Sequence, residues 1–130
     1  MRLQSLKHPI DVVRAVARPR VVRILGSASL LSLYPELDVP GGALERTIGA
    51  DFLIEPSSEA IAESLQFAAG RDSAFMSQNG YYLDILRPII TETLPAGWES
   101  HMHPVAGYDN VFALDPYDLA LVKLMVGREN

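Results

Sequence analysis

The chain has 130 residues and a mass of 14.3 kDa, the size of one ordinary domain with its own hydrophobic core. Hydrophobic residues make up 48% of it and charged residues 21%, a balance that excludes an intrinsically disordered chain. Eleven basic residues stand against sixteen acidic ones, for a net charge of −5. We therefore expect no non-specific binding to nucleic acid, which depends on an excess of positive charge.

Cysteine content and hydropathy exclude further classes. The chain has no cysteine, which rules out disulfides, thiolate catalysis, and zinc or iron–sulfur sites built on thiolates. No apolar run reaches the roughly 18–20 residues of a membrane-spanning helix. Residues 1–13 lack the apolar core and the small-residue cleavage site of a secretory signal. The prediction is a single cytoplasmic domain over residues 1–130.

Hydrophobic periodicity and turn residues divide the chain into short helices and strands. The first predicted helix ends before Pro19, because the residue that precedes a proline disfavours helical geometry. Asn79-Gly80, between two apolar runs, predicts a β-hairpin. The patterns predict helices over 10–17, 28–34, 56–69 and from 115 onward, and strands over 21–25, 47–54, 75–77, 81–86, 98–102 and 111–114. This order predicts an α/β (α+β) fold, a mixed sheet of about five to six strands flanked by helices.

Two groups of side chains admit both a structural and a functional interpretation. His101 and His103 are spaced like same-face residues of a strand. Since His8 is the only other histidine, a metal site would need distant carboxylates, and we expect exposed strand histidines instead. Four arginines lie within ten positions and form either a solvated helix end or a phosphate-facing patch; they are Arg14, Arg18, Arg20 and Arg23.

The most informative pattern combines a glycine turn with two isolated acids, in a sequence without the P-loop, dinucleotide-binding, zincin or hydrolase-elbow motifs. One predicted strand ends in Gly26-Ser27, where glycine allows close approach and helix amides face outward toward phosphate. Asp51 and Asp84 each interrupt an apolar strand, and burying an acid is costly unless a cation or hydrogen bonds satisfy it. On adjacent strands they could share one divalent ion. The alternative is that each acid lies on the solvent face of an edge strand.

These residues, in this order, resemble the nucleotidyltransferase superfamily (the DNA polymerase β-like fold), in particular its small bacterial members. That superfamily carries Gly-Ser on a turn, an Asp-x-Asp pair on the next strand and a third Asp on a later one. Leu25-Gly26-Ser27 fits the first element, Arg46-Thr47-x-x-x-Asp51 the second, and the segment 79–84, Asn-Gly-Tyr-Tyr-Leu-Asp, the third. The segments 94–98, 114–124 and 127–129 are also similar to parts of this subgroup.

The resemblance implies a nucleotidyltransferase-like fold and a nucleoside triphosphate bound with Mg²⁺. Asp51 and Asp84 would be the catalytic, metal-binding carboxylates; Gly26, Ser27, Arg46 and Lys123 would bind the nucleotide. The implied reaction transfers a nucleoside monophosphate to a hydroxyl of an RNA or protein acceptor. Small members often act in toxin–antitoxin pairs, so a protein partner is also implied. Lys123 and Arg46 have a simpler interpretation as solvent-exposed cations.

The sequence departs from the family pattern at one acid. Two carboxylates on one strand lie on the same face and next to each other at positions i and i+2. If Asp51 is the second acid, Gly49 takes the first position; if Asp51 is the first, Leu53 takes the second. A missing carboxylate should weaken divalent-ion binding and raise the barrier to transfer, unless Glu45 or Glu55 replaces it.

Three hypotheses therefore stand. The first is a nucleotidyltransferase that is active, at most weakly. The second is an inactive module that binds a nucleotide or serves protein–protein interaction. The third is an unrelated α/β scaffold.

Overall fold

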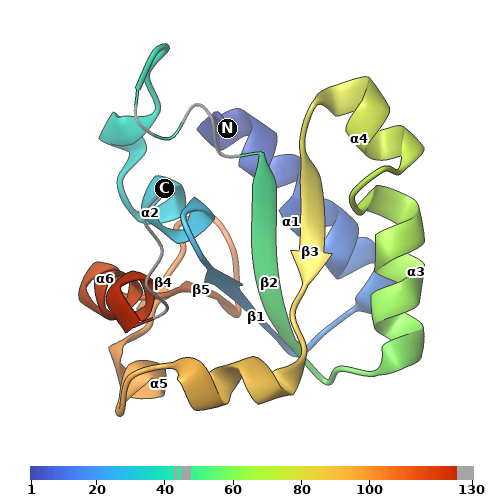
Figure 1. Ribbon diagram of the computed structural model, residues 1–130. Coiled ribbons are helices and arrows are strands. Elements are labelled where there is room, and N and C mark those ends of the chain that lie inside the picture. The colour runs from blue at the N-terminus through green and yellow to red at the C-terminus, as the bar shows by residue number, and fades with distance from the viewer. Residues whose placement is uncertain (43, 45–47, 126–130) are drawn as a thin grey trace.

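The computed structural model describes residues 1–42, 44 and 48–125, and these build a mixed sheet covered by helices (Figure 1). The five strands of this described part are β1 (Val21–Leu25), β2 (Gly49–Glu55), β3 (Tyr82–Ile85), β4 (His103–Pro104) and β5 (Val111–Ala113). The helices are α1 (Leu3–Ala17), α2 (Ala28–Leu33), α3 (Glu59–Ala69), α4 (Ala74–Asn79), α5 (Trp98–His101) and α6 (Pro116–Met125), with 3₁₀ segments η1 (Pro35–Leu37) and η2 (Pro88–Thr93). The predicted mixed α/β fold is confirmed. Within the described ranges, no helix combines the length and the apolar character that crossing a membrane requires.

The strand order is β3-β2-β1-β5-β4, with parallel and antiparallel neighbours combined. β1 runs antiparallel to β2 and parallel to β5, and β2 runs parallel to β3. Leu25 at the end of β1 lies opposite Asp51, which in turn lies opposite Asp84 of β3. The end of β1 and the first halves of β2 and β3 therefore meet at one end of the sheet.

Alternation along the strands separates two layers of core. One face packs against α1, α2 and α3 and holds the larger cluster, with Ile24 and Phe52 completely buried. In Figure 1, α1 passes behind β2 and β3 on this side. The opposite face holds a smaller cluster of Leu25, Leu53, Leu114 and Leu119, packed against residues of η2, α5 and α2. Asp51 belongs to this second face, because its neighbour Phe52 points into the first.

The predicted hairpin at Asn79-Gly80 is wrong. Residues 74–79 form α4, and Ser73 caps its N-terminus, because the Ser73 hydroxyl accepts a hydrogen bond from Met76 N at 3.2 Å. Gly80, with φ of +82°, ends that helix. A glycine in this conformation serves a helix C-terminus as well as a hairpin, and the dipeptide alone does not distinguish them. The consequence is large, because β3 then pairs parallel with β2 and aligns the two acids.

Two other elements also differ from prediction. The expected strand over 98–102 is helix α5, which follows Gly97 at φ of +82° and places the Trp98 ring beside Arg23, with Arg23 Cζ 5.5 Å from the ring centroid. Only the two-residue β4 remains of a strand in this region. The first helix begins at Leu3 rather than residue 10, because Leu6 and Pro9 extend the buried face of the helix toward the N-terminus.

Candidate functional site

A cleft of about 470 Å³ opens at the end of the sheet where β1 ends. Its polar lining includes five of the six predicted site residues, which are Gly26, Ser27, Asp51, Asp84 and Lys123. Its apolar lining comes from β1, the segment around η2, and α6, and comprises Leu25, Leu86, Ile90, Leu94, Leu114, Leu119 and Val122. Arg46, the sixth predicted residue, lies outside the described residues.

The two acids lie side by side on the sheet. Asp51 and Asp84 are register partners in the parallel β2–β3 pair, and neighbouring strands run roughly 4.8 Å apart. Asp51 is half-buried, whereas Asp84 is exposed on the edge strand. Both line the cleft, so two carboxylates face one space from adjacent strands.

Gly26 holds the turn after β1 close against Asp51. Its φ of +66° lies in the left-handed region that favours glycine. A β-carbon at Gly26 would lie only 2.6 Å from Asp51 Oδ2. The turn therefore passes directly beside the carboxylate, and only glycine leaves room for this arrangement.

Lys123 connects α6 to the same turn. Its Nζ donates a hydrogen bond to Ser27 Oγ at 3.2 Å, although the two residues are 96 positions apart. The lysine side chain is exposed at the cleft, so its ammonium is accessible to a ligand. The structure thus places an ammonium group beside the turn that passes next to Asp51.

Neither position that could carry a third acid on β2 does so. A β-carbon at Gly49 would lie 2.8 Å from both Cζ and Oη of Tyr82, so the tyrosine side chain already fills the space that a side chain at residue 49 would need. Leu53 is only 4% exposed and packs in the smaller core cluster. The strand therefore presents a single carboxylate, Asp51, to the cleft.

Glu55 does not replace the missing acid either. It pairs with Arg23, and this hydrogen bond holds the pKa of Glu55 below its ordinary value. Glu55 lines a separate hollow further along the same face of the sheet. Glu45, the other candidate, lies outside the described residues. Within 1–42, 44 and 48–125, no three acidic or histidine side chains are grouped as metal ligands would be.

The acid pair fits one magnesium ion rather than two. Mg²⁺ keeps several waters and is commonly held by one or two carboxylates together with phosphate oxygens of a ligand. Asp51 and Asp84 supply those two carboxylates from matched positions. Among the described residues, no further acidic side chain lines the cleft to hold a second cation.

The arginines between positions 14 and 23 were predicted to form either a solvated helix end or a phosphate-facing patch. Arg14 lies over the Tyr108 ring, with Cζ 5.4 Å from its centroid, while Arg20 and Arg23 both pair with Glu55. Arg14 therefore has a different partner from Arg20 and Arg23, and the structure gathers no phosphate-facing patch from these three arginines.

Both histidines are exposed, as predicted, and His103 lies in a strand, whereas His101 lies in a helix; both bind residues at the start of α6. His101 ends α5, and its Nδ1 lies 2.9 Å from Oδ2 of Asp118, which is 2% exposed. His103 begins β4, and its Nε2 lies 2.6 Å from Asp115 Oδ1. This hydrogen bond lowers the pKa of Asp115. The two pairs anchor the helix that carries Lys123, a role that spacing along the chain does not reveal.

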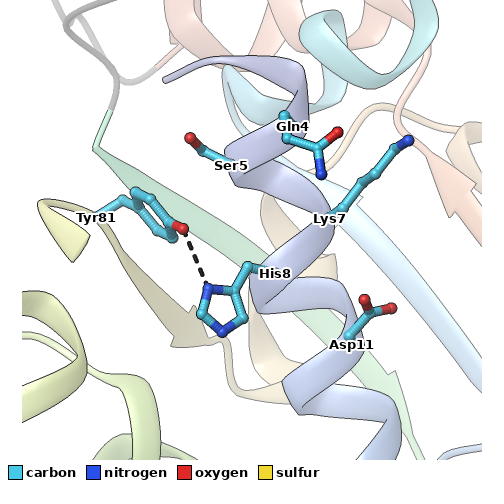
Figure 2. A pocket seen from close by; sticks show the side chains of 6 residues that line it. All are labelled: Gln4, Ser5, Lys7, His8, Asp11 and Tyr81. Carbon is cyan, nitrogen blue, oxygen red and sulfur yellow. Dashed lines mark hydrogen bonds between the residues drawn. The ribbon is translucent and has the colours of Figure 1, made fainter. Parts of the chain in front are cut away.

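A second hollow, of about 350 Å³, lies along α1 on the opposite side of the sheet from the acids. Figure 2 shows that its polar side chains do not converge: His8 turns to Tyr81, while Lys7 and Asp11 extend away from that pair. His8 Nδ1 lies 3.1 Å from Tyr81 Oη, an interaction that ties α1 to the segment before β3. The hydrogen bond in this hollow thus joins two elements of the fold, and its other polar side chains do not gather around one point.

The cleft between β1, β2, β3 and α6 is the stronger candidate, because it combines two carboxylates, an accessible ammonium and an apolar wall. Such a combination suits a ligand with an anionic group, a bound cation and an apolar ring. Comparison with models of known protein families, with curated proteins and with solved structures finds no match to this chain.

Proposed function

We propose that this chain binds a nucleoside triphosphate together with one Mg²⁺ and transfers its nucleoside monophosphate at most slowly. The observation that supports this proposal is the convergence of Asp51, Asp84 and Lys123 on one cleft beside the Gly26-Ser27 turn. The cleft's volume of about 470 Å³ lies within the range of small-molecule sites, roughly 300–1,000 Å³. A cytoplasmic location belongs to the same proposal, since nucleoside triphosphates are available there.

Each group has a distinct role in this proposal. Asp51 and Asp84 would hold the Mg²⁺, which when bound neutralises charge on the phosphate oxygens. Lys123 would donate to a phosphate oxygen, as a charge-assisted hydrogen bond is stronger than a neutral one. The apolar side chains of η2 and α6 would cover the ribose and base. This arrangement binds the substrate without needing a third acid.

Slow transfer follows from what the cleft lacks. An acceptor hydroxyl, from RNA or protein, must lose its proton as it attacks phosphorus, and positioned negative charge assists that step. Gly49 and Leu53 offer no such carboxylate beside Asp51. The net charge of −5 also disfavours tight binding of an RNA acceptor. We therefore place the protein nearer to nucleotide binding than to rapid turnover.

The test is a thermal-shift titration with each nucleoside triphosphate, with and without Mg²⁺. A ligand at a hundredfold excess over its Kd stabilises the folded state by about 2.7 kcal/mol. We expect a Mg²⁺-dependent shift in the wild type that Asp84→Asn abolishes and Asp11→Asn leaves intact. Asp11 is the matched control, because it is an exposed acid on α1. Equal shifts in all three proteins, or none with any nucleotide, would contradict the proposal.

A second candidate function, a protein-interaction module of the toxin–antitoxin type, is favoured by the outer face of α6. Tyr117 is 71% exposed and Leu124 is 76% exposed, and exposed Ala120 lies between them on the same side of the helix. The same titration separates the two candidates. Absence of any nucleotide-dependent shift would leave this apolar face as the better indication of function.

A further inference from the structure

Residue 49 is the place from which a second carboxylate beside Asp51 would project. Residues two apart on a strand share a face, so Gly49 and Asp51 both face the cleft. In the parallel pair, Gly49 lies opposite Tyr82 just as Asp51 lies opposite Asp84. Of these two cross-strand pairs, one joins Gly49 to Tyr82 and the other joins Asp51 to Asp84.

The tyrosine side chain crosses the strand boundary and occupies the space over Gly49. A β-carbon there would lie 2.8 Å from Tyr82 Cζ, 2.8 Å from Oη and 3.3 Å from Cε1. Real β-carbons essentially never approach within 3.0 Å, so any side chain at residue 49 requires the ring to move. The absence of an acid at residue 49 is therefore matched by a side chain that fills its place.

Arg71 holds the ring in this position. Its Nη2 donates to Tyr82 Oη at 3.0 Å, and its Cζ lies 5.2 Å from the ring centroid. The tyrosine is thus contacted both at its hydroxyl and through its ring.

We propose that Tyr82, held by Arg71, replaces the third carboxylate and limits the cleft to a single divalent cation. One cation balances the charge of the two acids, and a second would meet a phenol where it needs an anionic ligand. Because the hydroxyl accepts its hydrogen bond from Arg71, its own proton remains for a phosphate oxygen of the ligand. An acid at residue 49 would repel that phosphate. The inference rests on the proposed nucleotide function and adds the stoichiometry of the cation.

The test counts bound Mn²⁺ per chain by electron paramagnetic resonance, in the presence of saturating ATP. We expect one Mn²⁺ for the wild type and no gain for Gly49→Asp, whose carboxylate meets the tyrosine. Gly49→Asp combined with Tyr82→Ala frees the space, so we expect a second Mn²⁺ or an affinity at least about tenfold tighter. Tyr82→Ala alone is the control for loss of the ring.

Two results would overturn the inference: two Mn²⁺ bound to the wild type, or an equal gain from Gly49→Asp with and without Tyr82. Failure of the wild type to bind Mn²⁺ with any triphosphate would instead overturn the proposed function, and this inference with it. If the variants with an added acid fold poorly, a measurement without metal still tests whether the ring fills this space. Thermal melts should show that Gly49→Ala lowers the Tm much less when Tyr82 is also alanine. Additive losses would show that the ring does not occupy this space.

Discussion

Gly26 is the residue at which the smallest substitution should have a large effect. An alanine there must adopt the left-handed φ of +66°, which costs about 1–2 kcal/mol. Its β-carbon would also lie 2.6 Å from Asp51 Oδ2, so the carboxylate must leave its position. Forcing a side chain away from its rotamer costs roughly 0.5–1.5 kcal/mol. We expect Gly26→Ala to lower the free energy of unfolding by roughly 2–3 kcal/mol and to abolish Mg²⁺-dependent nucleotide binding.

Gly80→Ala is the matched control for this experiment. Gly80 has a φ of +82°, but a β-carbon there meets nothing within 4 Å, so it incurs only the backbone cost. Urea unfolding measures both, with a slope of about 1–3 kcal/mol per molar. The additional cost of about 1 kcal/mol should place the Gly26→Ala midpoint roughly 0.3–1 M below that of Gly80→Ala. Replacing Asp51 by alanine as well should recover that difference. Equal midpoints for the two single variants would refute the close approach to Asp51.

Three further substitutions test other parts of the cleft. Lys123→Ala should weaken nucleotide binding about tenfold in calorimetry while leaving the Tm unchanged, because the side chain is exposed. The control Lys7→Ala, at another exposed lysine, should change neither the affinity nor the Tm. Because Leu53 is buried, Leu53→Ala should lower the free energy of unfolding in urea by about 2–5 kcal/mol, and Leu53→Asp should prevent stable folding. A folded Leu53→Asp variant that binds Mn²⁺ more tightly than the wild type would contradict this expectation. The pKa of Glu55 lies below its ordinary value of 4.5 through its bond to Arg23, so its contribution to stability is present above that value and is lost as pH falls through the lowered pKa. Urea midpoints measured from about pH 6 down to about pH 2.5 should therefore fall less steeply for Glu55→Gln than for the wild type.

Local patterns predicted the strands at the centre of the sheet because their residues are β-branched or apolar and pack on both faces. β1 matches its prediction, and β2 differs by a residue or two at each end. The patterns failed where one local signal serves two structures. Asn79-Gly80 ends a helix here instead of turning a hairpin, since Ser73 had already started α4. Which outcome occurs depends on α4 packing against α3, a contact that the dipeptide does not encode.

The sequence predicted only the part of the site that local patterns reveal. An acid inside an apolar strand is visible in the sequence because burying it would be costly, although the structure leaves Asp51 half-buried and Asp84 exposed on the edge strand. The partners that surround those acids come from distant segments. Lys123 reaches Ser27 across 96 positions, and Arg71 reaches Tyr82 around the edge of β3. Only the register of the sheet shows that a tyrosine lies over Gly49, so the missing acid could be noticed but not explained.

Two glycines on either side of Asp51 together account for the shape of the cleft. At Gly26 the absent side chain leaves room for the Asp51 carboxylate, and at Gly49 it leaves room for the Tyr82 ring. The Asp51 carboxylate therefore lies against Gly26, and the Tyr82 ring lies against Gly49, where a side chain on either glycine would collide with them. A side chain at Gly26 would displace an acid that the proposed Mg²⁺ needs. A side chain at Gly49 would meet the Tyr82 ring, which by our proposal excludes a second cation. If both proposals hold, a side chain at Gly26 should abolish nucleotide binding, and an acid at residue 49 should add a cation only when Tyr82 is also replaced by alanine.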